Sequence, residues 1–440
     1  MNGVDYFYEY TDEELVELME DPWKVKMANL GQCYEGIGLF YWPLWKRPVG
    51  FALVQLLVYV TAQFQYITER TAHIVVTVLG LYLLYTQSAV MGHFFIPIIC
   101  WALFYGTDQL MLGRSDRGNL SLILAIICLW FWQINLSSEG FMQVRGVLMI
   151  MCMKMVSLSY DDLNPTFFEH LALVFNPATV IFGPYISLDQ FRRNMVRPNT
   201  TLKSLLLVLV YSAVAFGFCF YSTCLVELLP SEPEMLEDFK NAQAFRFSHF
   251  FVCYISLTTA LMAGFSSSFQ VAGALEVEWP KSMSEVVIHW NYPMHEFLHK
   301  YIFRRLVHTN YALAMLATFA MSSILHGLNF QLSAVLTSLA FYAYVETVFR
   351  QKLGNLLNVC ATGKKCKKCT HQSDNTSVTA IAISLIFTMI NVYHLIYLGM
   401  AFDGTEQETG YSYKHTISHW SRWNFSSHLI AVFMFFIGLL

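Results

Sequence analysis

Apolar side chains in this chain gather into long runs, and short polar stretches separate the runs. A helix needs about 20 apolar residues to cross roughly 30 Å of hydrocarbon. The pattern therefore predicts an all-α, polytopic membrane protein with about 10 to 12 transmembrane helices. The candidate spans are Val49–Tyr66, Ala72–Ser88, Phe94–Leu112, Asn119–Leu136, Phe141–Ser157, Phe167–Leu188, Leu202–Leu229, Phe247–Ala263, Tyr311–Leu328, Leu332–Val348, Val378–Met400 and His428–Leu440.

Composition supports this class, because 55% of the residues are apolar and only 13% are charged. An ordinary soluble domain carries about 25% charged residues. The segments near Gln133 and Arg145 carry polar groups that lipid would not tolerate, so some of the candidate segments are expected to be re-entrant or half-buried rather than spanning. GxxxxGK[ST] and GxSxG motifs are absent, and there are no repeated halves of a transporter. Nothing in the sequence indicates nucleic-acid binding.

The amino-terminal residues, with DYFYEYTDEELVELMED, are acidic and amphipathic and have no basic start or apolar core of a cleaved signal peptide. We therefore treat residues 1–45 as an acidic leader and interfacial segment. Residues 46–440 are expected to form a single membrane domain, with its chemistry in residues 278–330.

Loop charge predicts an orientation. Basic runs lie at 191–203, 300–308 and 350–368, whereas acidic loops lie at 227–239 and 401–410. The positive-inside rule places the basic runs in the cytosol, and the carboxyl terminus is then cytosolic as well. A helix that leaves the cytosol near residue 310 carries residue 326 about 24 Å upward, into the lumenal half of the bilayer.

His326 lies within an apolar run, in the stretch MSSILHGLNF. An imidazole there can be a packing residue, a metal ligand or a proton-transfer group. Metal ligation is the weakest of these interpretations, because no Cys, Asp or Glu is near it in sequence. Ionisable residues inside membrane segments commonly mark functional sites, and Asn291 is the partner that we expect for it.

Residues 276–308 mix carboxylates, histidines and tryptophans at helical spacing. One interpretation is an amphipathic helix at the cytosolic interface, where Trp and Tyr are favoured. Trp290 and Asn291 support a second interpretation. Because Pro293 weakens the local helical ladder and frees backbone groups, a buried polar site is expected at this point. Trp290 is a candidate for lining such a site.

A second cluster consists of Cys360, Cys366, Cys369 and His371. Four potential ligands within twelve residues can satisfy tetrahedral zinc, although their spacing fits no standard zinc motif well. In the cytosol these thiols would stay reduced, so a metal site, S-acylation and a solvated loop with incidental cysteines all remain open. Most of the other cysteines are expected to pack as small apolar residues.

Several stretches together resemble the membrane-bound O-acyltransferases, and within that family the enzymes that attach a lipid to Wnt proteins. The stretches keep their order over roughly residues 140–440. They are MKMVSLSYD at 153–161, VIFGPYISL at 180–188, FRFSHFFVCYISLTTALMAG at 245–264, EWPKSMSEVVIHWNYPMHEFLHKYIF at 278–303, SSILHGLNFQLSAVLTSLAFYAYVE at 322–346 and SHWS at 418–421.

This resemblance implies a fold with an internal reaction tunnel, with the family's histidine at His326 and its asparagine at Asn291. It implies a multi-pass enzyme of the endoplasmic-reticulum membrane that transfers palmitoleate from palmitoleoyl-CoA, without a cofactor, to a serine hydroxyl of Wnt proteins. On this hypothesis His326 is the general base and Asn291 orients the thioester or donates to the oxyanion. A lipid-acylating member of the family and a non-enzymatic transporter or scaffold are the alternatives.

Overall fold

The computed structural model of the chain describes residues 22–87, 92–361, 377–405 and 410–439. Within these ranges the regular elements are helices, which confirms the predicted all-α architecture. The first half contains α2 (Pro22–Gln63), α3 (Glu69–Thr86), α5 (Phe95–Leu110), α6 (Arg117–Asn135), α7 (Ser138–Tyr160), α8 (Phe167–Val174), α9 (Leu188–Val196) and α10 (Leu202–Thr223).

The second half begins with a short 3-10 helix and continues with helices of very different lengths. They are η1 (Leu225–Leu228), α11 (Glu234–Met262), α12 (Ala274–Glu278), α13 (Met283–Trp290), α14 (Tyr292–Leu298), the π-helical turn η2 (His299–Phe303), α15 (Arg304–Leu306), α16 (Tyr311–Leu325), α17 (Phe330–Leu357), α18 (Val378–Gly399), α19 (Tyr413–Arg422) and α20 (Ser426–Leu439).

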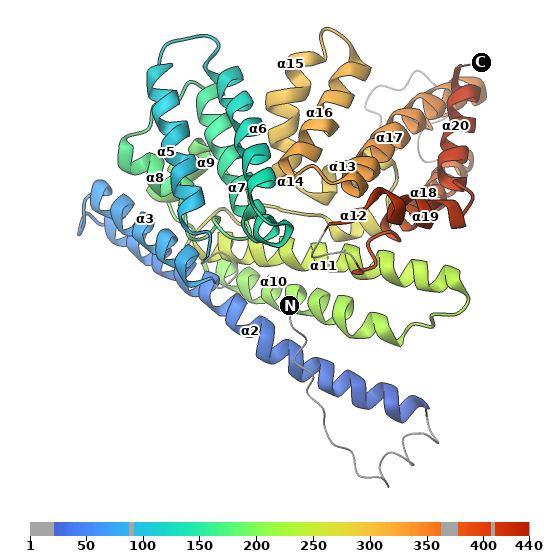
Figure 1. Cartoon of the computed structure of the whole chain (residues 1–440), viewed down its shortest axis with the longest axis horizontal. Helices are drawn as coiled ribbons and strands as arrows, with labels where there is room; N and C mark the ends of the chain where they lie inside the picture. Colours follow the sequence, from blue (N-terminus) through green and yellow to red (C-terminus); the bar gives the residue numbers. More distant parts are fainter. Residues whose placement is uncertain (1–21, 88–91, 362–376, 406–409, 440) are drawn as a thin grey trace.

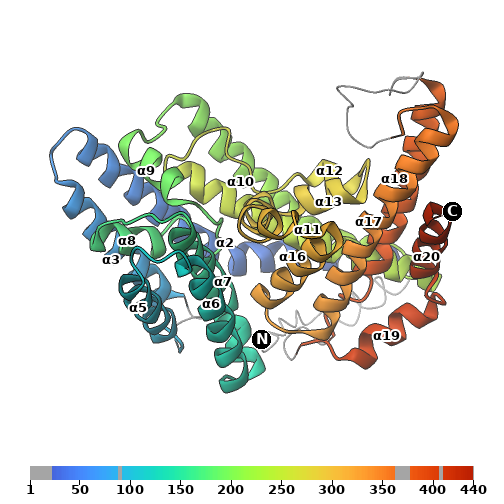
Figure 2. The ribbon, with the colours of Figure 1, turned by 90° about the horizontal axis from the view of Figure 1, so that it is seen from above.

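The helices form two flanks joined by a base. α10 and α11 lie side by side across the molecule, and α2 runs past them with α3 at its far end (Figure 1). α5, α6 and α7 gather on one flank, and α17 to α20 on the other (Figures 1 and 2). The short helices α13 and α14, together with α16, lie between the flanks (Figure 1). The segments predicted to carry chemistry are therefore central.

In the described part of the chain, six helices are both long and apolar enough to cross a membrane: α6, α7, α10 with η1, α11, α17 and α18. Two shorter apolar helices, α16 and α20, accompany them. Other predicted spans are helical but fall short of this standard. α3 begins with the charged residues Glu69 and Arg70, and α5 has only 16 residues.

The predicted span Phe167–Leu188 is wrong. α8 ends at Val174 after 8 residues, and irregular chain follows it as far as α9. Pro177 and Pro184 explain the difference, because proline has no N–H for the helical ladder and clashes with the preceding turn. Irregular backbone at membrane depth must be buried in protein, and Ile186 is fully buried.

The buried amine of Lys154 supports this irregular segment. Its Nζ donates to the backbone oxygens of Leu173 and Val174 at 2.9 and 3.3 Å and to Thr179 Oγ1 at 2.8 Å. Lys154 itself has no exposed surface. One side chain of α7 thus satisfies carbonyl groups at the carboxyl end of α8, where the helix leaves them without intrahelical partners. The lysine of the MKMVSL stretch accordingly has a structural role.

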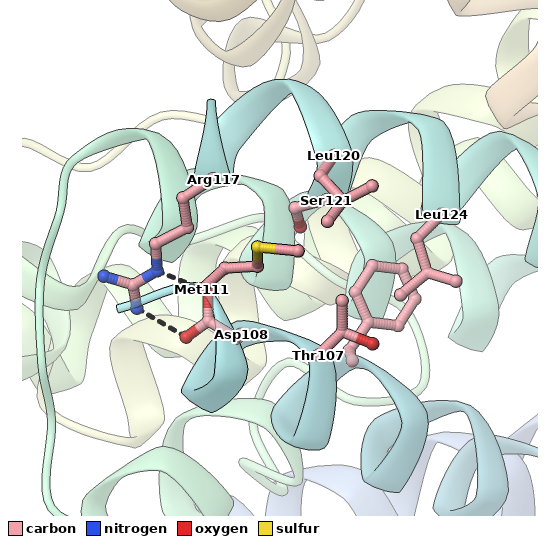
Figure 3. A pocket seen from close by; sticks show the side chains of 8 residues that line it. Thr107, Asp108, Met111, Arg117, Leu120, Ser121 and Leu124 are labelled. Atoms are coloured by element: carbon pink, nitrogen blue, oxygen red, sulfur yellow. Dashed lines mark hydrogen bonds and ion pairs between the residues drawn. The ribbon is translucent and has the colours of Figure 1, made fainter. Parts of the chain in front are cut away.

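A second buried cation joins α5, α6 and α7. Arg117 donates from Nε to Asp108 Oδ1 at 2.6 Å and from Nη1 to Asp162 Oδ1 at 2.8 Å, and Ser159 Oγ donates to Asp108 Oδ1 at 2.6 Å. Figure 3 shows the paired Arg117 and Asp108 beside a cavity lined by Met111 and neighbouring side chains. The cavity holds about 10 Å³, which is space for one water molecule. This cluster therefore has a structural role and holds α5, α6 and α7 together.

A disulfide joins α2 to the end of α10. Cys33 and Cys224 are bonded, with their Cα atoms 5.8 Å apart, and this pairing was not predicted from the sequence. Free buried thiols at Cys100, Cys128 and Cys253 fit the expectation that most cysteines pack as small apolar residues. Disulfides persist in oxidising compartments. α2 also runs without interruption through residues 45 and 46, where the leader was expected to end.

Candidate active site

His326 lies at the end of α16 and not within a helix. Its backbone N–H donates to Ser322 O at 3.1 Å, and Gly327 N donates to Ile324 O at 3.0 Å, which closes the last turn. The side chain is half-buried. Among the described residues none hydrogen-bonds to the imidazole, so both ring nitrogens are available to a substrate. A helix end fixes the backbone while it leaves this side chain free.

Gly327 makes the break between α16 and α17 possible. Its φ is +84°, a left-handed conformation that residues with a Cβ rarely adopt. A Cβ at this position would lie 2.7 Å from Phe141 Cε1 on α7. Asn329 then begins α17 as its N-cap, accepting a hydrogen bond from Leu332 N at 3.3 Å. The glycine therefore serves both the turn and the close approach of α7.

Two polar side chains of the α6–α7 flank hold this turn. Arg145 Nη1 donates to His326 O at 3.0 Å. Gln133 forms two hydrogen bonds with the backbone of Leu328. Gln133 Nε2 donates to Leu328 O, and Gln133 Oε1 accepts from Leu328 N, both at 2.8 Å. Both polar side chains thus bond to protein, while α6 and α7 themselves are long and apolar enough to cross a membrane rather than re-entrant by length or composition. Unpaired backbone groups at this depth would otherwise carry a large desolvation cost.

Asn291 forms the predicted break between α13 and α14. Its backbone is extended, with φ −155° and ψ 96°, and its Oδ1 accepts a hydrogen bond from Met294 N at 3.0 Å as the N-cap of α14. Pro293 occupies the first turn of that helix, where its missing N–H costs nothing. Because Oδ1 has this partner, the amide nitrogen Nδ2 is the group that Asn291 can present to a ligand.

His249 of α11 packs against Trp290, the residue before Asn291. Its ring stacks on the indole of Trp290 with centroids 4.2 Å apart and planes 9° apart, and its Nε2 lies 2.9 Å from Trp290 O. Trp290 is thus held against α11 immediately before Asn291. Its role in lining a substrate site stays a prediction.

A cavity of about 700 Å³ opens beside the break at Asn291. Tyr292, Pro293 and Glu296 line it, together with Arg193 and Arg197 of the basic run, so its charged groups carry a net positive charge. Ligand pockets in proteins commonly measure about 300 to 1,000 Å³. This cavity therefore has the size and the positive charge to admit a phosphorylated ligand next to Asn291.

Other basic groups near α14 have protein partners. Lys300 Nζ donates to Asp161 Oδ2 at 2.8 Å, and the guanidinium of Arg305 lies 3.9 Å from the centre of the Tyr160 ring. Tyr301 Oη also donates to Asp161 Oδ2 at 2.8 Å. These residues bind the end of α7 to η2 and α15. Arg193 of the cavity also has an acidic partner, Asp189, whose Oδ2 lies 2.7 Å from Arg193 Nη2, but that pair is exposed to solvent.

The predicted zinc or S-acylation cluster falls mostly outside the described residues, which contain Cys360 but not Cys366, Cys369 or His371. Cys360 is buried. Sequence reasoning missed His249 as a site residue, although it lies in one of the quoted stretches. Its only signal was its polar ring within the apolar run of α11.

Comparison with known proteins identifies relatives over most of the chain. The model of the membrane-bound O-acyltransferase family matches residues 38–368. The protein-serine O-palmitoleoyltransferase porcupine of Caenorhabditis briggsae is 31% identical over 365 residues, which cover 78% of this chain and 80% of the relative. The proteins of that name from Homo sapiens and Mus musculus are 29% and 30% identical, each over 76% of this chain and 81% of the relative.

Proposed function

The chain belongs to the membrane-bound O-acyltransferase family, and on that premise we propose that it transfers palmitoleate from palmitoleoyl-CoA to a serine hydroxyl of Wnt proteins. The acyl group and the serine acceptor are those in the names of its relatives. The observation that carries the proposal is the imidazole of His326, which has no hydrogen-bond partner among the described residues and lies at the end of α16, a helix that packs against α14, the helix that Asn291 caps.

In the proposed reaction the serine Oγ attacks the carbonyl carbon of the thioester while a nitrogen of His326 takes the hydroxyl proton. The carbon–sulfur bond then breaks, and the CoA thiolate receives that proton from the imidazolium. The products are the serine ester and free CoA, so the proton balance closes within one turnover. A positioned base of this kind contributes about 10²- to 10⁴-fold to the rate.

Asn291 is the proposed donor to the developing oxyanion. Its Oδ1 already accepts a hydrogen bond from Met294 N, and this contact fixes which of the two amide atoms faces the backbone of α14. Nδ2 is then available to stabilise negative charge on the thioester oxygen. Loss of one such donor costs about 10²- to 10³-fold in rate in a comparable site.

The cavity lined by Arg193 and Arg197 is the proposed entrance for CoA, because guanidinium groups match phosphate oxygens in charge and geometry. Both arginines belong to the basic run that loop charge assigns to the cytosol. The disulfide at Cys224 adjoins the acidic loop assigned to the lumen, which agrees with an oxidising compartment. We therefore propose the endoplasmic-reticulum membrane, with a cytosolic carboxyl terminus.

The test supplies purified protein with labelled palmitoleoyl-CoA and one of two acceptors, a Wnt hairpin peptide with its serine or a mixture of sterol and diacylglycerol. Transfer to the serine peptide, and not to the same peptide with alanine in place of serine, supports the proposal. Label in neutral lipid alone would identify a lipid-acylating enzyme. Acyl-CoA that is neither bound nor consumed would indicate a transporter or scaffold, and either result overturns the proposal.

A further inference from the structure

Three potential metal ligands converge at the amino-terminal part of α19. His415 and His419 are four residues apart and therefore lie on one face of the helix. Asp403, in the loop after α18, places Oδ1 3.5 Å from His415 Nε2 and Oδ2 3.4 Å from His419 Nε2. All three side chains are largely buried, with 11 to 14% of their surface exposed. The three ligand atoms lie within 4.8 Å of one another.

These separations fit a zinc coordination sphere. Zinc binds imidazole nitrogen and carboxylate oxygen at about 2.0 to 2.2 Å, so neighbouring ligand atoms of a tetrahedron lie roughly 3.3 to 3.5 Å apart. Each imidazole Nε2 lies at that distance from one of the two carboxylate oxygens of Asp403. Two histidines and one carboxylate are also a ligand set that zinc uses with water in the fourth position. We propose that Asp403, His415 and His419 form a Zn²⁺ site.

The carboxylate is oriented before any metal binds. Asp403 Oδ1 accepts hydrogen bonds from Thr405 N at 3.1 Å and from Thr405 Oγ1 at 2.8 Å. Groups of this kind fix the direction of a metal ligand, and their loss typically costs about 10- to 100-fold in affinity. The Asp403 side chain therefore loses little conformational freedom when the ion binds.

Zinc binding changes two hydrogen bonds of the histidines. His415 Nε2 now lies 3.1 Å from Ala401 O, but that carbonyl also accepts from Gln331 Nε2 at 2.9 Å and stays satisfied when His415 turns to the metal. Arg422 Nη2 donates to His419 Nδ1, and this contact gives way when Nδ1 carries the proton of a metal-bound imidazole. Arg422 keeps Asp238 as an acceptor, at 3.0 Å.

The site would connect α19 to the turn that holds His326. Thr416 Oγ1 donates to Gln331 Oε1 at 3.1 Å, and Gln331, in the first turn of α17, is fully buried. A Cβ on Gly410 would lie 3.1 Å from Asn329 Nδ2. The ion would therefore hold the loop between α18 and α19 against the start of α17, three to five residues after the candidate base.

The test measures zinc binding directly. All proteins carry Cys366→Ser and Cys369→Ser, which removes the other zinc candidate of the chain. Parent protein in detergent is treated with chelator, dialysed against Zn²⁺ alone and analysed for bound metal, and its affinity is measured by competition with a chromophoric chelator. Asp403→Asn, His415→Gln and His419→Gln are compared with His308→Gln, a histidine that is exposed and outside the cluster.

The parent and His308→Gln should each retain one Zn²⁺ and gain thermal stability from it, because a ligand that binds only the folded state stabilises it. Each ligand variant should bind more than about 100-fold more weakly, beyond the loss expected for an outer partner. Asp403→Asn is the decisive variant, since its amide oxygen can still accept from Thr405 and preserve the fold. Zinc affinity unchanged in Asp403→Asn, or no zinc on the parent, would overturn the site. Neither result depends on acyl transfer.

Discussion

Arg145 donates from Nη1 to the backbone carbonyl of His326 at 3.0 Å, so a side chain of α7 holds the residue at which α16 ends. The two residues are 181 positions apart in the chain. The bond acts on the backbone of His326 and leaves the ring free. Arg145 is therefore a positioning residue of the proposed base.

Replacing Arg145 with methionine should lower kcat about 10- to 100-fold with little change in KM for palmitoleoyl-CoA. A hydrogen bond from a charged group contributes about 1.5 to 3 kcal/mol, and about 1.4 kcal/mol corresponds to tenfold in rate. Arg145→Lys should recover part of the loss. Arg114→Met is the control, because the Arg114 side chain is 61% exposed. Equal losses in kcat for Arg145→Met and Arg114→Met would refute a positioning role.

Gly327→Ala should reduce both activity and thermal stability. The substitution forces a Cβ into a left-handed conformation, at about 1 to 2 kcal/mol, and into contact with Phe141. Gly113→Ala separates these effects, because Gly113 has a φ of +77° and no atoms near a Cβ. Melting temperatures of both variants in detergent decide the point. If the two variants were equally stable, the close approach of Phe141 would not matter.

The Cys33–Cys224 disulfide gives a test of orientation. In sealed microsomes, a membrane-impermeant maleimide should not label these cysteines after reduction until the membrane is permeabilised, because the account places them in the lumen. A protein with Cys33→Ser and Cys224→Ser shows the background from other thiols. Labelling of reduced, intact microsomes from outside would reverse the proposed orientation.

His170 should make stability depend on pH. Burial lowers the pKa of its imidazole from 6.5 to about 4, and Trp101 Nε1 donates to its Nδ1 at 3.0 Å, which requires that nitrogen to be unprotonated. The unfolded chain binds a proton more readily, so the free energy of unfolding falls as pH drops from 6.5 towards 4, by about 3 kcal/mol in total.

The measurement compares the melting temperature of the parent with that of His170→Asn over this range. Asparagine keeps an acceptor for Trp101 but does not titrate, so the variant should lose less stability on acidification. Identical slopes for the two proteins would show that His170 is not responsible.

Local patterns predicted much of the fold. Apolar runs located most helices, and Pro293 correctly indicated the break at Asn291. The same reasoning failed at residues 167–188, where apolar content was given more importance than Pro177 and Pro184. A proline within an apolar run should have ended the predicted helix.

Long-range partners could not be predicted. Gln133 and Arg145 were recognised as polar groups that must avoid lipid, but their acceptors lie 195 and 181 residues away. Cys33 and Cys224 are 191 residues apart, and cysteine connectivity does not follow from sequence alone. Likewise, the spacing of His415 and His419 is visible in the sequence, whereas the approach of Asp403 depends on how a loop folds back on α19.

The most direct test of the account replaces His326 and measures acyl transfer. His326→Ala and the control His308→Ala are purified at equal yield and supplied with labelled palmitoleoyl-CoA and the Wnt serine peptide. We expect His326→Ala to bind acyl-CoA still but to lose about 10²-fold or more in kcat, the contribution of a general base, while His308→Ala matches the parent. Serine acylation by His326→Ala at the parent rate would contradict the assignment of His326 as the base.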